Sequence, residues 1–278
     1  MLKQWIIAAA LLLGLCFPVQ GQDRLPLRSA DRIPFRPGEK VVVSLHYKWG
    51  VINADVCAMT FTADTTRLGG RKVWHTRAFG QSVKLVETFF KLREDYQSWF
   101  SFDGLEPIRA TRNAQEGNYW AKDVFVYDWK AGVIRATLEN KSKGRFTKDI
   151  PVSKPVFDVP SILYLARNAD LTRMRPGVHY PMPLAVDDAV QALYLRYIGP
   201  DEISLPGVGR VRTLKFACST RESNAFSGKD EMILWFSDDA NRIPVFMEIT
   251  IRKGAIKGRL TRWEGLAAPF EALVQSAR

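Results

Sequence analysis

The chain has 278 residues, of which 46% are hydrophobic and 25% are charged, as in a folded globular protein rather than a disordered one. Its 19 glycines and 15 prolines exclude a collagen-like or low-complexity chain, and its three cysteines are too few for a disulfide-dense scaffold. Lysine and arginine outnumber aspartate and glutamate by 40 to 29, so the protein is basic.

The first residues have the pattern of a secretory signal peptide. Lys3 precedes an apolar run from Trp5 to Phe17, and the short stretch that ends at Gly21 fits a cleavage site. The run has about 13 residues, fewer than the roughly 20 that a helix needs to cross a bilayer. We therefore predict a signal peptide over residues 1–21, cleaved between Gly21 and Gln22.

Export is expected to place the protein in the periplasm or on the periplasmic face of the outer membrane. A lipoprotein acylated at Cys16 is disfavoured, because the bulky Leu15 stands where a small residue is required. No later apolar run is long enough for a transmembrane helix. In such a compartment a basic protein meets lipid headgroups and acidic glycans rather than nucleic acid. The basic residues are scattered, which favours solvated strand faces over one anion groove.

After a proline-containing lead-in over residues 22–37, the sequence alternates with the period of a β-strand. Val41, Val43 and Leu45, for example, are separated by residues that suit a solvated face. Glycine- and aspartate-containing turns separate the segments. The expected strands are Val41–Trp49, Ala54–Thr62, Lys72–Phe79, Asp95–Phe102, Glu106–Ala114, Asn118–Asp128, Gly132–Asn140, Arg145–Pro151, Tyr180–Val186, Ala189–Ile198, Val208–Thr220, Asp230–Ser237, Arg242–Arg252 and Ala255–Glu264.

Two segments depart from this period and predict short helices. Apolar residues recur every three or four positions over 82–92, and Pro160 with Ser161 opens a second apolar segment over 158–169. The prediction is a mainly β protein of curled antiparallel sheets, barrel-like or sandwich, with two short helices. It forms one domain over 38–265, with two barrel-like halves that meet near 151–160 as the alternative, and residues 266–278 form a tail.

Seven short stretches, in this order along the chain, carry a resemblance to a known family: Pro37-Gly38-Glu39-Lys40, Tyr47-Lys48-Trp49-Gly50, Phe89-Phe90-Lys91-Leu92-Arg93-Glu94-Asp95-Tyr96, Phe157-Asp158-Val159-Pro160-Ser161-Ile162-Leu163, Leu214-Lys215-Phe216-Ala217-Cys218, Trp235-Phe236-Ser237-Asp238-Asp239 and Arg242-Ile243-Pro244-Val245. On these stretches the chain resembles the exported bacterial family of domain-of-unknown-function 3108 proteins, particularly its Bacteroides-type members. That resemblance implies an exported, mainly β protein with curled, barrel-like sheets, and it implies no established reaction, cofactor or catalytic residue.

Two tryptophans are the best candidates for a ligand surface. Trp99 is expected on the strand face opposite Tyr96, and Trp263 on the same face as Lys257 and Arg259. Aromatic rings beside cations suit a lipid or an acidic glycan. Trp49, by contrast, follows the apolar alternation of its strand and is expected in the core.

The sequence contains no established catalytic motif, and we predict neither an enzyme nor a cofactor. The three histidines, His46, His75 and His179, lie far apart in sequence, so no metal site is predicted. Paired acids that could serve glycoside hydrolysis occur at Asp187-Asp188, at Glu231 and at Asp238-Asp239, but aspartate pairs are typical of turns.

Cys57 and Cys218 are the two cysteines that remain after the predicted cleavage. Both lie on apolar strand faces. An oxidising compartment permits a disulfide between them, but nothing in the sequence brings the two strands together. We therefore favour two separate buried thiols.

The leading functional hypothesis is an exported, non-enzymatic protein that binds an amphipathic or anionic envelope component, a lipid or a glycan. The alternatives are a structural protein that contacts an envelope partner through a strand edge or aromatic patch, and a glycan or peptidoglycan hydrolase. A large apolar cavity would favour the first hypothesis, a flat tryptophan-bearing surface the second, and two facing carboxylates the third.

Overall fold

The computed structural model describes residues 24–29, 32–153, 155–220, 232–251 and 254–276. The predicted signal peptide, its cleavage site at Gly21–Gln22, Cys16 and Glu231 lie outside these residues. Among the described residues, no helix is long and apolar enough to span a membrane.

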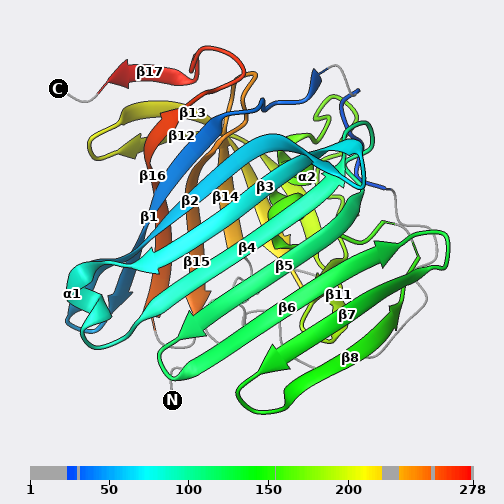
Figure 1. Ribbon diagram of the computed structural model, residues 1–278. Coiled ribbons are helices and arrows are strands. Elements are labelled where there is room, and N and C mark those ends of the chain that lie inside the picture. The colour runs from blue at the N-terminus through cyan, green and yellow to red at the C-terminus, as the bar shows by residue number, and fades with distance from the viewer. Residues whose placement is uncertain (1–23, 30–31, 154, 221–231, 252–253, 277–278) are drawn as a thin grey trace.

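The N-terminal half is an antiparallel meander in which each strand pairs with the next (Figure 1). Its strands are β1 (Glu39–Trp49), β2 (Ile52–Leu68), β3 (Arg71–Ser82), β4 (Leu92–Ser101), β5 (Pro107–Glu116), β6 (Tyr119–Asp128), β7 (Val133–Asn140) and β8 (Gly144–Pro151). Alternation decides which face of each strand is buried: in β4, Tyr96 and Phe100 face inward while Gln97 and Trp99 face outward.

The C-terminal half continues the same sheet, because β1 pairs with the late strand β16. The remaining strands are β9 (Tyr180–Pro181), β10 (Leu184–Val186), β11 (Ala189–Gln191), β12 (Tyr194–Leu205), β13 (Gly209–Ser219), β14 (Met232–Ser237), β15 (Pro244–Ile251), β16 (Gly254–Glu264) and β17 (Leu273–Ser276). The sheet runs from β8 through β1 and β16 to β12 and β9, and β10 pairs with β11 in a separate hairpin. The mainly β, curled antiparallel fold predicted from the sequence is confirmed.

Some strand boundaries differ from those predicted. Pro183 separates β9 from β10, so the segment 180–186 is not one strand. The strand expected to stop at Ile198 instead continues as β12 through Pro200 to Leu205. Pro200 is tolerated because β9 covers β12 only at its first two residues, so β12 is an edge strand at Pro200. The segment expected as a tail contributes β17, which pairs with β13.

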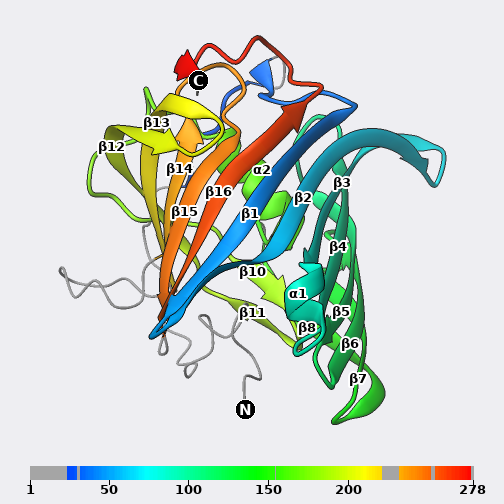
Figure 2. The ribbon, with the colours of Figure 1, turned by 90° about the vertical axis from the view of Figure 1, so that its left-hand side faces the viewer.

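The second predicted helix is confirmed as α2 (Val159–Arg167), which lies inside the curl of the sheet (Figure 2). Asp158 caps it: its carboxylate accepts a hydrogen bond from the Ser161 N–H at 3.0 Å, and Ser161 Oγ accepts one from the Asp158 N–H at 2.9 Å. This capping box fixes where the helix begins. Tyr164 and Leu165 are buried and pack the helix into the core.

The first predicted helix shrinks to the four-residue α1 (Lys84–Glu87), and none of its residues is buried. The apolar spacing over 82–92 was misleading because its members serve different elements. Leu92 belongs to β4 and is buried, whereas Leu85 and Phe89 point into solvent.

A buried ion pair ties α2 to the first residue of β1, a central strand of the sheet. Arg167 donates to both carboxylate oxygens of Glu39 in β1, at 2.6 and 2.8 Å. It also donates to the carbonyls of Pro34 and Asn241, at 3.0 and 2.9 Å. One guanidinium therefore joins the lead-in, β1, α2 and the β14–β15 connection.

Candidate functional site

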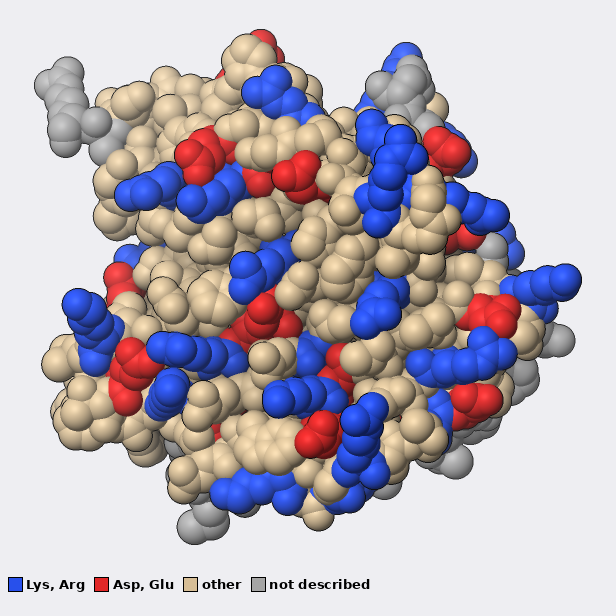
Figure 3. Space-filling model, in the orientation of Figure 1, with Lys and Arg blue, Asp and Glu red and all other residues tan. Residues whose placement is uncertain are grey.

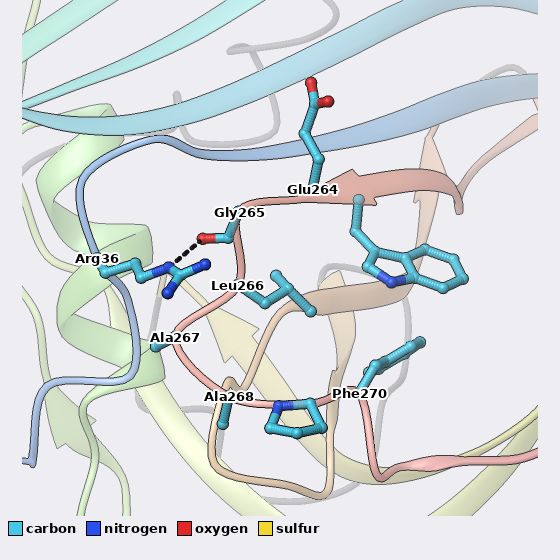
Figure 4. Close-up of a pocket in the computed structure, with 9 residues that line it drawn as sticks. Arg36, Glu264, Gly265, Leu266, Ala267, Ala268 and Phe270 are labelled. Atoms are coloured by element: carbon cyan, nitrogen blue, oxygen red, sulfur yellow. Dashed lines mark hydrogen bonds between the residues drawn. The ribbon is translucent and has the colours of Figure 1, made fainter.

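An open groove of about 420 Å³ lies where β16 ends and the chain crosses to β17. Its lining residues are Arg36, Trp263, Glu264, Gly265, Leu266, Ala267, Ala268, Pro269 and Phe270 (Figure 4). Trp263 meets Phe270 edge-on, with ring centroids 4.7 Å apart. Most of the lining side chains are thus apolar, but polar atoms, including those of the one cation Arg36, form somewhat more of the exposed lining than carbon does.

Buried polar contacts hold the loop of the groove in shape. Asn241, which is fully buried, accepts a hydrogen bond from the Ala268 N–H at 2.8 Å and donates to the Pro269 carbonyl at 3.0 Å. Gly265 has φ +65°, and a Cβ there would collide with the backbone of Gly38. Because these contacts fix the backbone, the groove is formed before any ligand binds.

The charges around the groove favour an anionic ligand over a cationic one. The exposed Arg36 donates through Nε to the Gly265 carbonyl at 3.1 Å, which anchors the guanidinium beside Leu266. Glu264 points away from the loop in Figure 4 and pairs with Lys40 at 3.0 Å. Lys40 therefore offsets the negative charge of Glu264, while the guanidinium of Arg36 stands at the margin of the groove.

The prediction that Trp263 shares a face with Lys257 and Arg259 is wrong. The pairing of β1 with β16 shifts register between Val42 and Val43, so Trp263 lies opposite the inward-facing Val41. A bulge of this kind inserts one extra residue and reverses the facing of every residue beyond it. The bulge thereby turns Trp263 toward the core that lines the groove.

Lys257 and Arg259 lie instead on the outer face of the sheet, opposite His46 and Ser44 of β1. There Arg259 pairs with Asp55 at 3.0 Å, and Lys257 pairs with Glu248 at 3.3 Å. The side chain of His46 contacts the same Asp55 at 2.9 Å. These two cations are thus engaged in surface ion pairs and do not join a tryptophan.

Trp99 lies on the outer face, on the other side of its strand from Tyr96. Its ring stacks on His75 with centroids 4.7 Å apart, and the guanidinium of Arg109 lies 5.9 Å from its centroid. The His75 ring therefore covers one face of the Trp99 ring, and Arg109 lies close to it. Trp99 is for this reason poorly suited to stack on a sugar. It is not part of the groove.

Trp49, which was expected in the core, is 46% exposed. The alternation of β1 holds through Leu45, but the strand then runs past the sheet's inner packing to the β1–β2 turn. A position on the apolar face is buried only where another element covers it.

The acidic pairs singled out in the sequence have structural roles. Asp187 occupies the β10–β11 turn with φ +51°, and Asp188 lies 3.7 Å from both Lys143 and Lys148. Asp239 accepts hydrogen bonds from Ser237 Oγ and from backbone N–H groups of the β14–β15 connection. Each therefore stabilises a turn or an ion pair.

A buried charged cluster on the inner face of the sheet was missed by the sequence reasoning. Arg112 of β5 hydrogen bonds to Asp187 at 2.9 Å and lies within 4.0 Å of the carboxylates of Asp123, Glu94 and Glu116. All but Asp187 are buried. The sequence does contain a sign of this cluster, because Asp123 takes an inward position of β6 between the apolar Ala121 and Phe125.

Burial dominates the protonation of this Arg112 cluster. Desolvation raises the pKa of Glu94 to about 8, against the attraction of Arg112 and with help from the like charge of Glu116. Desolvation likewise raises the pKa of Asp123 to about 6, again opposed by Arg112. The adjoining space is only about 20 Å³, enough for roughly one water and too small for a sugar.

Cys57 in β2 and Cys218 in β13 are both buried, and no disulfide joins them. Burial raises the pKa of the Cys57 thiol to about 12, so this thiol is protonated and unreactive at neutral pH. Among the described residues, no group of three or more histidine, cysteine or acidic side chains is placed to hold a metal ion.

Comparison with known families decides which family this fold represents. The family model described as "Protein of unknown function (DUF3108)" matches residues 43–261, which covers most of the sheet. The chain belongs to the DUF3108 family. The match begins within β1 and ends within β16, so this DUF3108 region includes both strands that join the halves of the sheet.

The DUF3108 chain is also similar in fold to a solved structure. That protein, a beta-barrel-like protein of domain of unknown function DUF1849 from Brucella abortus, is 10% identical, with a TM-score of 0.49 over 83% of this chain and 98% of its own. No curated protein matches the chain significantly.

Proposed function

We propose that this DUF3108 protein is an exported, non-enzymatic protein that binds an amphipathic or anionic component of the cell envelope. The observation that carries the proposal is the groove, where Trp263, Leu266 and Phe270 form an apolar surface next to the guanidinium of Arg36. An apolar surface beside one fixed cation suits an amphiphile with an anionic head, because the tail and the head each find a matching surface.

The scattered surface charge supports a local site rather than a broad anion-binding face. Figure 3 shows lysines and arginines distributed over the face formed by β2 to β8, with carboxylates between them. Several of these cations are paired, as Arg77 is with Asp95 at 2.7 Å. Paired cations attract polyanions weakly, so we assign ligand recognition to the groove.

The hydrolase alternative receives little support from the acids that were its candidates. Asp187, Asp188 and Asp239 are bound in turns and ion pairs, and the carboxylates around Arg112 adjoin space for about one water. A glycosidase needs two carboxyl groups on either side of a sugar.

Export has its own test. We expect the protein expressed in a Gram-negative host to be recovered from the periplasm with Gln22 as its first residue, because the apolar run before Gly21 is too short to remain as an anchor. N-terminal sequencing decides the point. Recovery of an uncleaved cytoplasmic chain, or of a lipid-modified chain starting at Cys16, would overturn this part of the proposal.

Binding at the groove can be tested with dodecyl phosphate below its micelle concentration, with dodecyl maltoside as a neutral amphiphile of equal chain length. Calorimetry should show tighter binding of the phosphate. The variant Arg36→Ala should weaken that binding at least about fivefold, the effect of losing one charge-assisted hydrogen bond. Phe270→Ala should weaken binding of both amphiphiles, because it removes part of the apolar surface.

The matched control is Arg71→Ala, which removes an exposed arginine at the β2–β3 turn and should leave the affinity unchanged. Equal binding of the two amphiphiles, or equal effects of Arg36→Ala and Arg71→Ala, would refute the groove as the site. Thermal unfolding of each variant shows whether the fold is retained.

A further inference from the structure

A second surface lies at the opposite ends of the strands from the groove. The β1–β2 turn and the α1 connection between β3 and β4 both emerge there, as the pairings of Trp49 with Ile52 and of Cys57 with Ser82 require. Figure 2, which views the molecule from this end, shows the β1–β2 turn at the lower left and α1 to its right. We call this the α1 rim, defined by residues 48–51 and 84–91.

The α1 rim exposes four large apolar side chains. The exposed fractions are 46% for Trp49, 101% for Val51, 77% for Leu85 and 87% for Phe89. Val51, Leu85 and Phe89 are more than three-quarters exposed, so these three side chains contribute little folding free energy. Exposed apolar side chains that project from one end of a molecule are typical of a contact surface.

Local folding does not require these residue types. Gly50, with φ +56°, makes the tight β1–β2 turn, and the β-branched Val51 beside it is a poor turn residue. In the α1 connection, backbone hydrogen bonds from Val86, Phe89 and Phe90 close the turns. The apolar side chains of Leu85 and Phe89 take no part in these hydrogen bonds and are therefore not needed to close the turns.

The charges flanking these tips are mostly positive. Lys48, Lys84 and Arg93 are exposed, and Lys91 is half-buried. Glu87 is the single carboxylate between Val83 and Arg93, and it pairs with Arg93 at 3.2 Å. In Figure 3 several lysine and arginine groups, with carboxylates between them, lie at the end of the molecule where α1 lies in Figure 1.

We propose that the α1 rim docks this protein on an anionic lipid bilayer, with Val51, Leu85 and Phe89 inserted among the headgroups. Short apolar tips flanked by lysine and arginine combine the two forces that hold peripheral proteins on membranes: burial of apolar surface and attraction to anionic lipid. In this arrangement Trp49, two residues from Val51, would lie between the water and the acyl chains, where tryptophan is favoured.

A lipid bilayer is a better match for the α1 rim than a groove on a partner protein would be. The tips belong to two separate connections, and each projects alone beyond the sheet. A bilayer accommodates separate tips without shape complementarity, because lipid packs around each one. The lysine side chains suit a surface of diffuse negative charge.

The test uses co-sedimentation of the purified protein with vesicles of 70% phosphatidylcholine and 30% phosphatidylglycerol, and with vesicles of phosphatidylcholine alone. We expect binding to the anionic vesicles at least about tenfold stronger than to the neutral ones, and about tenfold weaker in 0.5 M salt. All preparations must share one N-terminus, verified by intact mass, because the apolar run of residues 5–17 would bind lipid by itself.

The double variant Val51→Asp/Phe89→Asp should lower vesicle binding at least tenfold. The matched control is Val126→Asp, which adds a carboxylate at an exposed apolar position of β6 far from the rim. All of the changed side chains are exposed, so the variants should fold normally. Failure of wild type to prefer anionic vesicles, or an equal effect of the control and the double variant, would refute the proposal. Neither Val51 nor Phe89 lines the groove, so a loss of vesicle binding in the double variant separates this surface from the groove.

Discussion

Replacement of Arg167 by methionine should lower the free energy of unfolding by about 3–5 kcal/mol, the largest single effect expected in this protein. The side chains of Arg167 and Glu39 are 1% and 0% exposed. Removal of the guanidinium leaves the Glu39 carboxylate buried without a partner and also frees the carbonyls of Pro34 and Asn241. The cost comes mainly from these uncompensated groups rather than from the attraction lost.

Chemical denaturation at neutral pH measures this effect. The double variant Arg167→Met/Glu39→Leu should recover much of the loss, because it removes both charges together. Arg173→Met is the control: that arginine is 65% exposed in its ion pair with Asp170, and its loss should cost little. A loss below about 1 kcal/mol in Arg167→Met would contradict the assigned role. If that variant does not fold, Arg167→Lys, which keeps the charge but loses the two-point contact, supplies the measurement.

The sequence predicts local features of this fold well and long-range ones poorly. In β4 and β5 polar and apolar residues alternate because one face of each strand is solvated, and this alternation can be recognised in the sequence alone. The beginning of α2 is visible too, because Asp158, Pro160 and Ser161 form the cap locally. A local sequence pattern does not show whether a distant element packs over a strand face. The prediction that Trp49 lies in the core was wrong for this reason.

The candidate site shows the same division. Trp263 was predicted as a ligand residue from its neighbours in β16, but the bulge that sets its facing arises only when β16 meets β1. Arg36 comes from the other end of the chain and could not be associated with Trp263 before the fold was known. The Arg112 cluster likewise gathers β4, β5, β6 and the β10–β11 turn. Pairing distant strands brings these groups together.

The Arg112 cluster should make the protein less stable at pH 8 than at pH 5. The folded-state pKa of Glu94, about 8, lies above its ordinary value of 4.5, so the folded state holds a proton that the unfolded state has lost between these values. Stability from this group is therefore complete below about pH 4.5 and is lost as the pH rises through 8. Asp123 and Asp158, both with a pKa of about 6, act in the same direction at lower pH.

The variant Glu94→Gln isolates the contribution of this residue. It stays neutral in both states, so the fall in the free energy of unfolding between pH 5 and pH 8 should shrink, by on the order of a few kcal/mol. The groups that face Glu94 oppose one another: Arg112 favours its charged form, whereas Glu116 disfavours it. Denaturant titrations at pH 5, 6.5 and 8 measure the slope, with Glu271→Gln at an exposed position as the control. An unchanged slope in Glu94→Gln would show that Glu94 is already ionised in the folded protein at pH 5, held so by Arg112, and burial would then be the weaker of the two effects.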